Sequence, residues 1–219
     1  PGAENLDITF NQFSGYLKVN GTKNIHYWLV ESINDPKNDP IAFWTNGGPG
    51  CSGLLGFFTE LGPFRPNADM SLGFHEYTWN SIANMVFIES PCGVGFSYSE
   101  ESDDYKNGDT QTAIDNYELI QAFFTRFPEY QENDMYITSE SYGGHYLPTL
   151  AKEIVDQNTA GVNPTLNFKG FFLGNPVTTW YSFYPSGLDT YGIITLKLVK
   201  IQLKKISSYV VNTMSMPHC

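Results

Sequence analysis

The stretch Ile137-Thr138-Ser139-Glu140-Ser141-Tyr142-Gly143-Gly144 joins a short apolar run, typical of a buried strand, to a helical pattern that begins near Tyr146. A serine at such a strand-to-helix turn matches the nucleophile elbow, a strained bend that exposes the serine hydroxyl above a sheet. The bend needs small neighbours: Ser139 stands where the G-x-S-x-G pattern has its first glycine, and Gly143 keeps the second. The start of the following helix also favours negative charge that develops beside Ser141. We therefore predict that Ser141 is a nucleophile, although the motif alone leaves open a chance serine in a turn.

A glycine-rich loop gives the second signal. The segment 44–53 (WTNGGPGCSG) follows the apolar run 41–45, so its backbone N–H groups should lie at the carboxyl edge of the sheet, where α/β sites form. Such N–H groups can stabilise the oxyanion of an acyl-transfer intermediate. One donor normally comes from a loop after an earlier strand and the other from the residue after the nucleophile, which predicts Gly48 and Tyr142. A phosphate-binding loop is the alternative, but no Gly-Lys-Ser/Thr ending follows the glycines.

The rest of the chain alternates predicted strands and helices. Apolar alternation and short apolar runs predict strands over residues 8–10, 13–19, 24–30, 41–45, 85–89, 135–138 and 168–173, and helical periodicity predicts helices over 110–127 and 146–155. The first strands are expected to be antiparallel at a sheet edge. Strands that alternate with helices imply a mostly parallel sheet. The predicted fold class is therefore α/β, with a central mostly parallel sheet, antiparallel N-terminal strands and flanking helices.

Composition limits the partners and the compartment. The 219 residues carry a formal net charge of -11, which disfavours nucleic acid as a partner. No stretch approaches the roughly 20 apolar residues of a membrane span, and no signal peptide is visible. The sequon Asn20-Gly21-Thr22 makes Asn20 a candidate glycosylation site and mildly favours the secretory route. The three cysteines, Cys51, Cys92 and Cys219, fit no metal site, and their odd number implies a free thiol or a partner elsewhere.

Five motifs occur in an order that resembles the serine carboxypeptidases. They are WTNGGPGCSG, ELGPFRP, ESPCGVGFSYS, SESYGG and GNP, and the resemblance runs from about Phe13 to Tyr191. It implies an α/β-hydrolase fold, in which residues 1–192 form the N-terminal part of the core. Residues 193–219 would begin a helical cap insertion, with the C-terminal part of the fold absent. The resemblance also implies removal of C-terminal residues from peptides and proteins at acidic pH, in a vacuolar, lysosomal or secreted setting.

The resemblance assigns roles to individual residues. Ser141 matches the nucleophile, and Gly48 and Tyr142 match the oxyanion donors. The positions that bind the terminal carboxylate of the substrate correspond to Trp44, Asn46, Gly47, Glu60 and Glu140. An amide N–H of Asn46 can donate to a carboxylate. Two glutamates beside a substrate carboxylate cannot all ionise, so one must keep its proton and donate it, which predicts stronger binding in acid. Without the flanking motifs, Glu60 would be read as a solvated helix residue and Glu140 as a plain turn residue.

A serine nucleophile needs a base and an orienting carboxylate. In the family these lie far downstream, in a Gly-Asp segment and a Gly-His segment that this sequence does not contain. His26, on an early strand, and His75, in a loop, are expected to be surface or packing residues. His145 follows Ser141 too closely to serve as its base, and His218 stands at the terminus.

Three accounts of the missing base remain open. In the first, a second polypeptide carrying the Asp and His completes a carboxypeptidase, with a disulfide through Cys51 or Cys219 as the expected link. In the second, the chain is a truncated, inactive product, and in the third it is a binding protein that does not catalyse. An acyltransferase is the alternative activity: plant relatives that use glucose esters commonly carry Asp where this chain has Glu140, which favours the peptidase. No metal or organic cofactor is expected, because acyl transfer by serine requires none.

Overall fold

The computed structural model describes residues 3–4 and 6–179. The chain divides into a compact unit, Pro1–Pro176, and a second unit, Val177–Cys219, of which only residues 177–179 are described. The strands of the first unit are β1 (Gln12–Val19), β2 (Lys23–Val30), β3 (Ile41–Thr45), β4 (Phe64–Pro66), β5 (Leu72–Phe74), β6 (Asn84–Ile88), β7 (Met135–Glu140) and β8 (Phe168–Gly174). The helices are α1 (Gly53–Leu55), a π-helical turn (Gly56–Glu60), α2 (Asp109–Arg126), α3 (Gly143–Ala160) and short 3-10 turns at Trp79–Ser81, Ser102–Tyr105 and Pro128–Tyr130.

Six strands form one mixed sheet in the order β1-β2-β6-β3-β7-β8, and β4 pairs with β5 separately. The pairs β1–β2 and β2–β6 are antiparallel, whereas β3–β6, β3–β7 and β7–β8 are parallel. This arrangement confirms the predicted α/β class, with a mostly parallel sheet and antiparallel strands at the N-terminal edge. Thr45 pairs with Ser139 at the ends of β3 and β7, so the glycine loop and the serine turn leave the sheet side by side.

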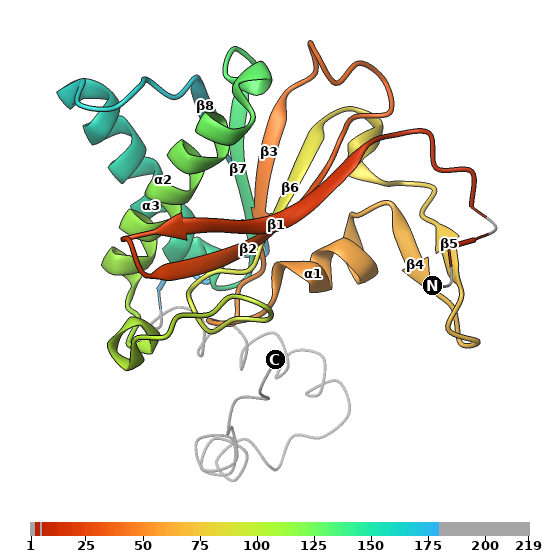
Figure 1. The fold of residues 1–219 in the computed structure, drawn as a ribbon, viewed down its shortest axis with the longest axis horizontal. Helices are drawn as coiled ribbons and strands as arrows, with labels where there is room; N and C mark the ends of the chain where they lie inside the picture. The colour runs from red at the N-terminus through yellow and green to blue at the C-terminus, as the bar shows by residue number, and fades with distance from the viewer. Residues whose placement is uncertain (1–2, 5, 180–219) are drawn as a thin grey trace, which may run out of the picture. The chain divides into compact units, whose positions relative to one another are not determined.

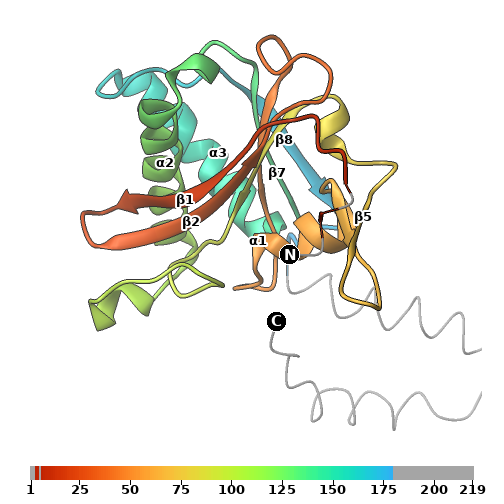
Figure 2. The ribbon, with the colours of Figure 1, turned by 45° about the vertical axis from the view of Figure 1, so that its right-hand side comes forward.

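Helices α2 and α3 lie together on one face of the sheet, as Figures 1 and 2 show. Strand residues of alternating position, such as Phe43 and Ile137, point into this face and are at most 2% exposed. Phe123 of α2 is fully buried, and its ring centroid lies 5.2 Å from that of Phe43. A parallel sheet needs an apolar cover of this kind, because its strands are apolar on both sides.

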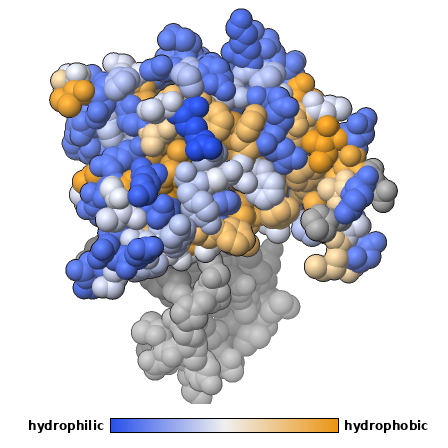
Figure 3. All heavy atoms as spheres, viewed as in Figure 1, coloured by the Kyte–Doolittle hydropathy of each residue, from blue (hydrophilic) through white to orange (hydrophobic). Residues whose placement is uncertain are grey.

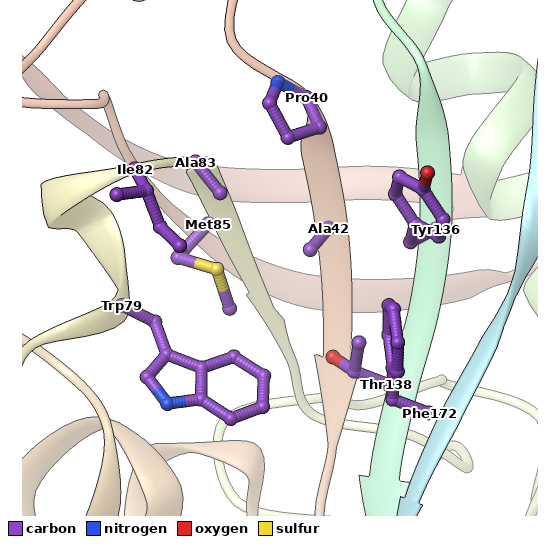
Figure 4. Close-up of a pocket in the computed structure, with 9 residues that line it drawn as sticks. All are labelled: Pro40, Ala42, Trp79, Ile82, Ala83, Met85, Tyr136, Thr138 and Phe172. Carbon is purple, nitrogen blue, oxygen red and sulfur yellow. The ribbon is translucent and has the colours of Figure 1, made fainter.

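The opposite face is covered only in part. The segment from α1 to β4 packs Phe57, Leu61 and Phe64 against Trp44 and Phe87, which makes a second apolar cluster. Beside this cluster, over β3, β6, β7 and β8, lies a hollow of about 380 Å³. Figure 4 shows the nine side chains that line it: Pro40, Ala42, Trp79, Ile82, Ala83, Met85, Tyr136, Thr138 and Phe172. Trp79, Ile82 and Phe172 are 41%, 69% and 57% exposed.

Two predicted boundaries are wrong. Residues 8–10 form no strand; Ile8 and Phe10 pack against the second apolar cluster, and the Ile8 N–H donates to the carbonyl of Leu6 nearby. Helix α3 runs over Gly143–Ala160 rather than 146–155: the two glycines behind the serine turn already adopt helical geometry, and the helix continues to a left-handed cap at Gly161. The predicted domain boundary at residue 192 and the predicted cap over 193–219 lie outside the described residues.

Hydrophobic and hydrophilic residues are interspersed on the face of the molecule that Figure 3 shows. None of the helices in the described part of the chain has the length and apolarity needed to span a bilayer.

Candidate active site

The turn between β7 and α3 holds Ser141 in a strained conformation. Its φ of 53° lies in the left-handed region that non-glycine residues rarely adopt, and such outliers gather at functional sites. The Ser141 N–H donates to the carbonyl of Gly174 at the end of β8 (2.9 Å), and the Ser141 carbonyl accepts the Gly144 N–H (3.1 Å). Strand β8 and the first turn of α3 therefore hold the bend from both sides. Among the described residues, no side chain forms a hydrogen bond to the Ser141 hydroxyl.

The glycine loop lies directly against this turn. A Cβ atom on Gly47 would stand 2.5 Å from the backbone nitrogen of Tyr142 and 3.0 Å from Cβ of Ser141, so only glycine fits there. The structure thus brings Gly47, the residue directly before Gly48, against Ser141 and the backbone nitrogen of Tyr142. This is the juxtaposition that the two predicted oxyanion donors require.

Ser139 and Gly143 fit each other across the turn. A Cβ on Gly143 would lie 2.1 Å from Oγ of Ser139, so the serine side chain occupies the space that a larger residue 143 would need. The Ser139 hydroxyl also accepts a hydrogen bond from Thr45 at 3.3 Å. The departure from the G-x-S-x-G pattern at residue 139 is therefore matched by a glycine at residue 143.

The five predicted carboxylate-binding residues lie together. The Asn46 side-chain amide donates to Oε1 of Glu60 (2.9 Å) and to Oε1 of Glu140 (3.1 Å). Its oxygen accepts from the Trp44 indole (2.8 Å) and from the Gly56 N–H (3.0 Å). The amide is thus saturated and orients both glutamates. Trp44, Glu60 and Glu140 border a cavity of about 410 Å³.

Glu60 has an altered acidity. Burial raises the pKa of its carboxyl group, and the charge of nearby Glu140 raises it further, although the Asn46 hydrogen bond and Arg65 act in the opposite direction. The Glu60 proton is therefore held to a higher pH than that of an ordinary glutamate, as the argument for a protonated donor in this pair requires.

The histidines serve other contacts. His145 stacks on the ring of Tyr142, with ring centroids 4.7 Å apart. His75 contacts the Arg65 guanidinium (Nη2 to Nδ1, 2.8 Å). His26 is buried with Nδ1 3.1 Å from Oε2 of Glu89, so it is a packing residue rather than a surface residue. His218 lies outside the described residues.

Sequence reasoning missed Glu89, which ties several loops together. Its buried carboxylate accepts from the hydroxyl of Ser52, at the end of the glycine loop, and from the N–H of Phe96 (2.8 Å). Burial alone would raise the pKa of Glu89, but hydrogen bonds from His26, Ser52 and the Phe96 N–H outweigh it, so the pKa is lowered. The sequence signals were its place directly after the apolar run 85–88 and at the start of the ESPCGVGFSYS motif.

The cysteines divide into two kinds. Cys92 is a buried free thiol, and burial raises its pKa. Cys51 is disulfide-bonded, and Cys219 lies outside the described residues.

A mixed sheet with a strained serine turn beside a glycine loop defines an α/β-hydrolase. A proline iminopeptidase from Mycobacterium smegmatis has the same fold, with a TM-score of 0.53 at 12% identity over 94% of this chain and 56% of that one. Residues 1–209 match the model of the serine carboxypeptidases, and the chain belongs to that family.

Relatives and a solved structure agree with this assignment. The lysosomal protective protein of Mus musculus is 47% identical over 173 residues, 78% of this chain. Serine carboxypeptidase-like 27 of Arabidopsis thaliana is 45% identical over 185 residues, 81% of this chain. A prohormone-processing carboxypeptidase from Saccharomyces cerevisiae superposes with a TM-score of 0.73 at 26% identity, over 87% of this chain and 45% of that one. The chain spans 35% of the length of the mouse protein and 40% of that of the plant protein.

Proposed function

We propose that this chain carries the nucleophile half of a serine carboxypeptidase that removes C-terminal residues from peptides and proteins. The observation that supports it most is the contact between Gly47 and the Ser141–Tyr142 turn. The hydroxyl oxygen of Ser141 attacks the carbonyl carbon of the last peptide bond while its proton passes to a base. The N–H groups of Gly48 and Tyr142 stabilise the oxyanion. The C–N bond then breaks as the leaving amine takes that proton, and water hydrolyses the acyl-enzyme.

The Asn46–Glu60–Glu140 cluster is proposed to select a free C-terminus. With its pKa raised, Glu60 keeps a proton in acid and donates it to the substrate carboxylate. Once Glu60 ionises, the donor is lost and like charges face each other. The proposal therefore includes an acidic optimum, in keeping with a lysosomal, vacuolar or secreted setting; one relative is named a lysosomal protein. Trp44 lines the cavity beside these glutamates, and Gly47 is proposed to belong to the same carboxylate site.

The catalytic Asp and His are proposed to come from a C-terminal polypeptide that corresponds to the remaining length of the relatives, either continuous with this chain or separate. The apolar hollow on the open sheet face supports this. Both faces of a parallel sheet are normally covered, and this chain accounts for 35–40% of its relatives' length. We assign the hollow to an apolar segment of that polypeptide, which docks against Met85, Tyr136 and Phe172.

The substrate test uses two N-blocked dipeptides that differ only at the C-terminus, one a free carboxylate and the other an amide. The native assembly should release the last amino acid from the acid and leave the amide nearly untouched, and Ser141→Ala should abolish release. Equal hydrolysis of both contradicts the carboxylate pocket. Transfer from a glucose ester to an alcohol without peptide hydrolysis would instead establish the acyltransferase.

Mass spectrometry of the native protein tests the partner. A disulfide-linked or tightly bound polypeptide with a Gly-His segment supports the completed enzyme, whereas a single species of this length supports the inactive product. Phe172→Asp should release the partner, since it places a charge in the hollow. Association with a second copy of this chain would assign the hollow to a homodimer and contradict our assignment.

A further inference from the structure

Tyr146, one helical turn after the nucleophile, reaches the glycine loop. Its hydroxyl oxygen lies 3.2 Å from the nitrogen of Gly50 and accepts that N–H. The side chain is only 5% exposed, and its ring stands nearly perpendicular to that of Tyr142, with centroids 5.1 Å apart. A single tyrosine on α3 therefore contacts both the loop and the turn that carry the proposed oxyanion donors.

The loop is a tight fold with two anchored ends. The carbonyl of Gly47 accepts the N–H of Cys51 at 3.2 Å, and Gly48 lies between them with a φ of 110°. One end of the loop rests on the serine turn through Gly47. The other end is held by the Tyr146 hydroxyl through Gly50. The direction of the Gly48 N–H depends on both anchors, because it lies on the backbone between them.

The Tyr146 hydroxyl is suited to a permanent hydrogen bond. Burial raises its pKa to about 12, so the phenol stays neutral throughout the pH range in which the protein can work. A buried hydroxyl with few accessible rotamers loses little entropy when it holds a partner. Removing the Tyr146 hydroxyl would leave the Gly50 N–H without this acceptor, and the loop would be free to turn toward another hydrogen-bond acceptor.

We propose that Tyr146 is a positioning residue of the oxyanion hole, holding the glycine loop so that the Gly48 N–H faces the oxyanion formed at Ser141. This rests on the proposed function. The donor acts on charge that develops only in the transition state, so its misplacement lowers kcat. The carboxylate site proposed at Glu60 and Glu140 is held by the Asn46 amide rather than by Tyr146, so KM should change little.

Tyr146→Phe in the native assembly tests this, because the variant keeps the ring and removes only the oxygen. We expect kcat to fall roughly 10- to 100-fold with KM within about twofold. Affinity for a peptide aldehyde, which forms a tetrahedral adduct with the serine, should fall by the same factor. Tyr117→Phe is the matched control: Tyr117 is a buried tyrosine of α2 whose hydroxyl accepts from Gln121, and its loss should leave kcat unchanged.

The outcomes separate the two proposals. If the wild type hydrolyses peptides and the Tyr146→Phe variant keeps both its kcat and its affinity for the aldehyde, the positioning role alone is overturned. The positioning role is also overturned if Tyr117→Phe lowers kcat as much as Tyr146→Phe does. The same holds if the loss of kcat in Tyr146→Phe equals the fraction of that variant that is unfolded, because the effect would then be one of stability. A wild type that neither hydrolyses peptides nor reacts with a serine-directed fluorophosphonate overturns the proposed function and the inference together.

Discussion

The two faces of the central strands differ sharply although the strands that make them are the same. On one face Phe43 and Ile137 are at most 2% exposed beneath α2 and α3. On the other, Phe172 is 57% exposed at the edge of the apolar hollow. Both faces carry apolar side chains, and what differs is whether the described chain covers them. The covered face holds the fold together, whereas the open face is where the family's remaining polypeptide is expected.

The largest expected effect comes from matched substitutions on the two faces. Phe123→Ala, under the sheet, should lower the free energy of unfolding by about 3–5 kcal/mol, because it leaves a cavity among packed rings. Phe172→Ala, in the hollow, should change it by less than about 1 kcal/mol in this chain. Urea denaturation followed by circular dichroism measures both.

Phe123→Leu provides a milder variant if the alanine protein does not fold. Equal losses at the two sites would break the comparison, since they would mean that the hollow is already filled.

The serine turn, which α3 supports from the covered face, gives the next effect. Gly143→Ala should lower the free energy of unfolding by about 1–3 kcal/mol, because the new methyl group meets the Ser139 hydroxyl. Adding Ser139→Gly should restore most of that loss. A double-mutant cycle in urea checks the coupling, and additive losses would show that the two residues do not share one space.

A pH effect distinguishes the carboxylate cluster from the rest of the site. The native pKa of Glu60 is raised, so its contribution to folding stability and to binding is present in acid and lost as pH rises through that pKa. KM for a free-carboxylate substrate should therefore rise roughly tenfold across this range. Glu60→Gln, which always carries an N–H donor, should flatten the profile. A variant that keeps the wild-type pH dependence of KM would assign the effect to another group.

The smallest effect concerns the turn between β1 and β2, at the surface of the molecule. Asn20 is exposed there with a φ of 51°, and its backbone N–H bonds to Glu118 at 2.7 Å. We predict an N-linked glycan on Asn20 in protein from a secretory host. Thr22→Ala should remove it and Thr22→Ser should keep it, with stability changes within about 0.5 kcal/mol. Peptide mapping after glycosidase treatment reads this out, and an unmodified Asn20 in the wild type contradicts the prediction.

Local patterns were sufficient to predict most of the fold. The six strands of the main sheet, both long helices and the serine turn follow from apolar periodicity and from glycine and proline positions, whereas β4 and β5 were not predicted. Residues 8–10 show the limit: they alternate like a strand, but no backbone in the described part of the chain pairs with them as a strand, and only the side chains of Ile8 and Phe10 pack into the apolar cluster.

Short motifs named the candidate site residues that are neighbours in sequence, but contacts between distant segments of the site had no such signal. Gly48, Ser141 and Tyr142 stand in short motifs. The contacts of Glu89 with Ser52 and of Tyr146 with Gly50 join segments that only the folded sheet brings together. Saturation of the Asn46 amide by two glutamates was also invisible in sequence, because it depends on side-chain geometry.

The most direct test of the account is labelling of the native assembly with a tagged fluorophosphonate, followed by peptide mapping. We predict one labelled peptide, modified at Ser141, and no labelling in Ser141→Ala. A native assembly that carries no label at Ser141, or a Ser141→Ala variant that is labelled as strongly as the wild type, would contradict the assignment of this serine as the nucleophile.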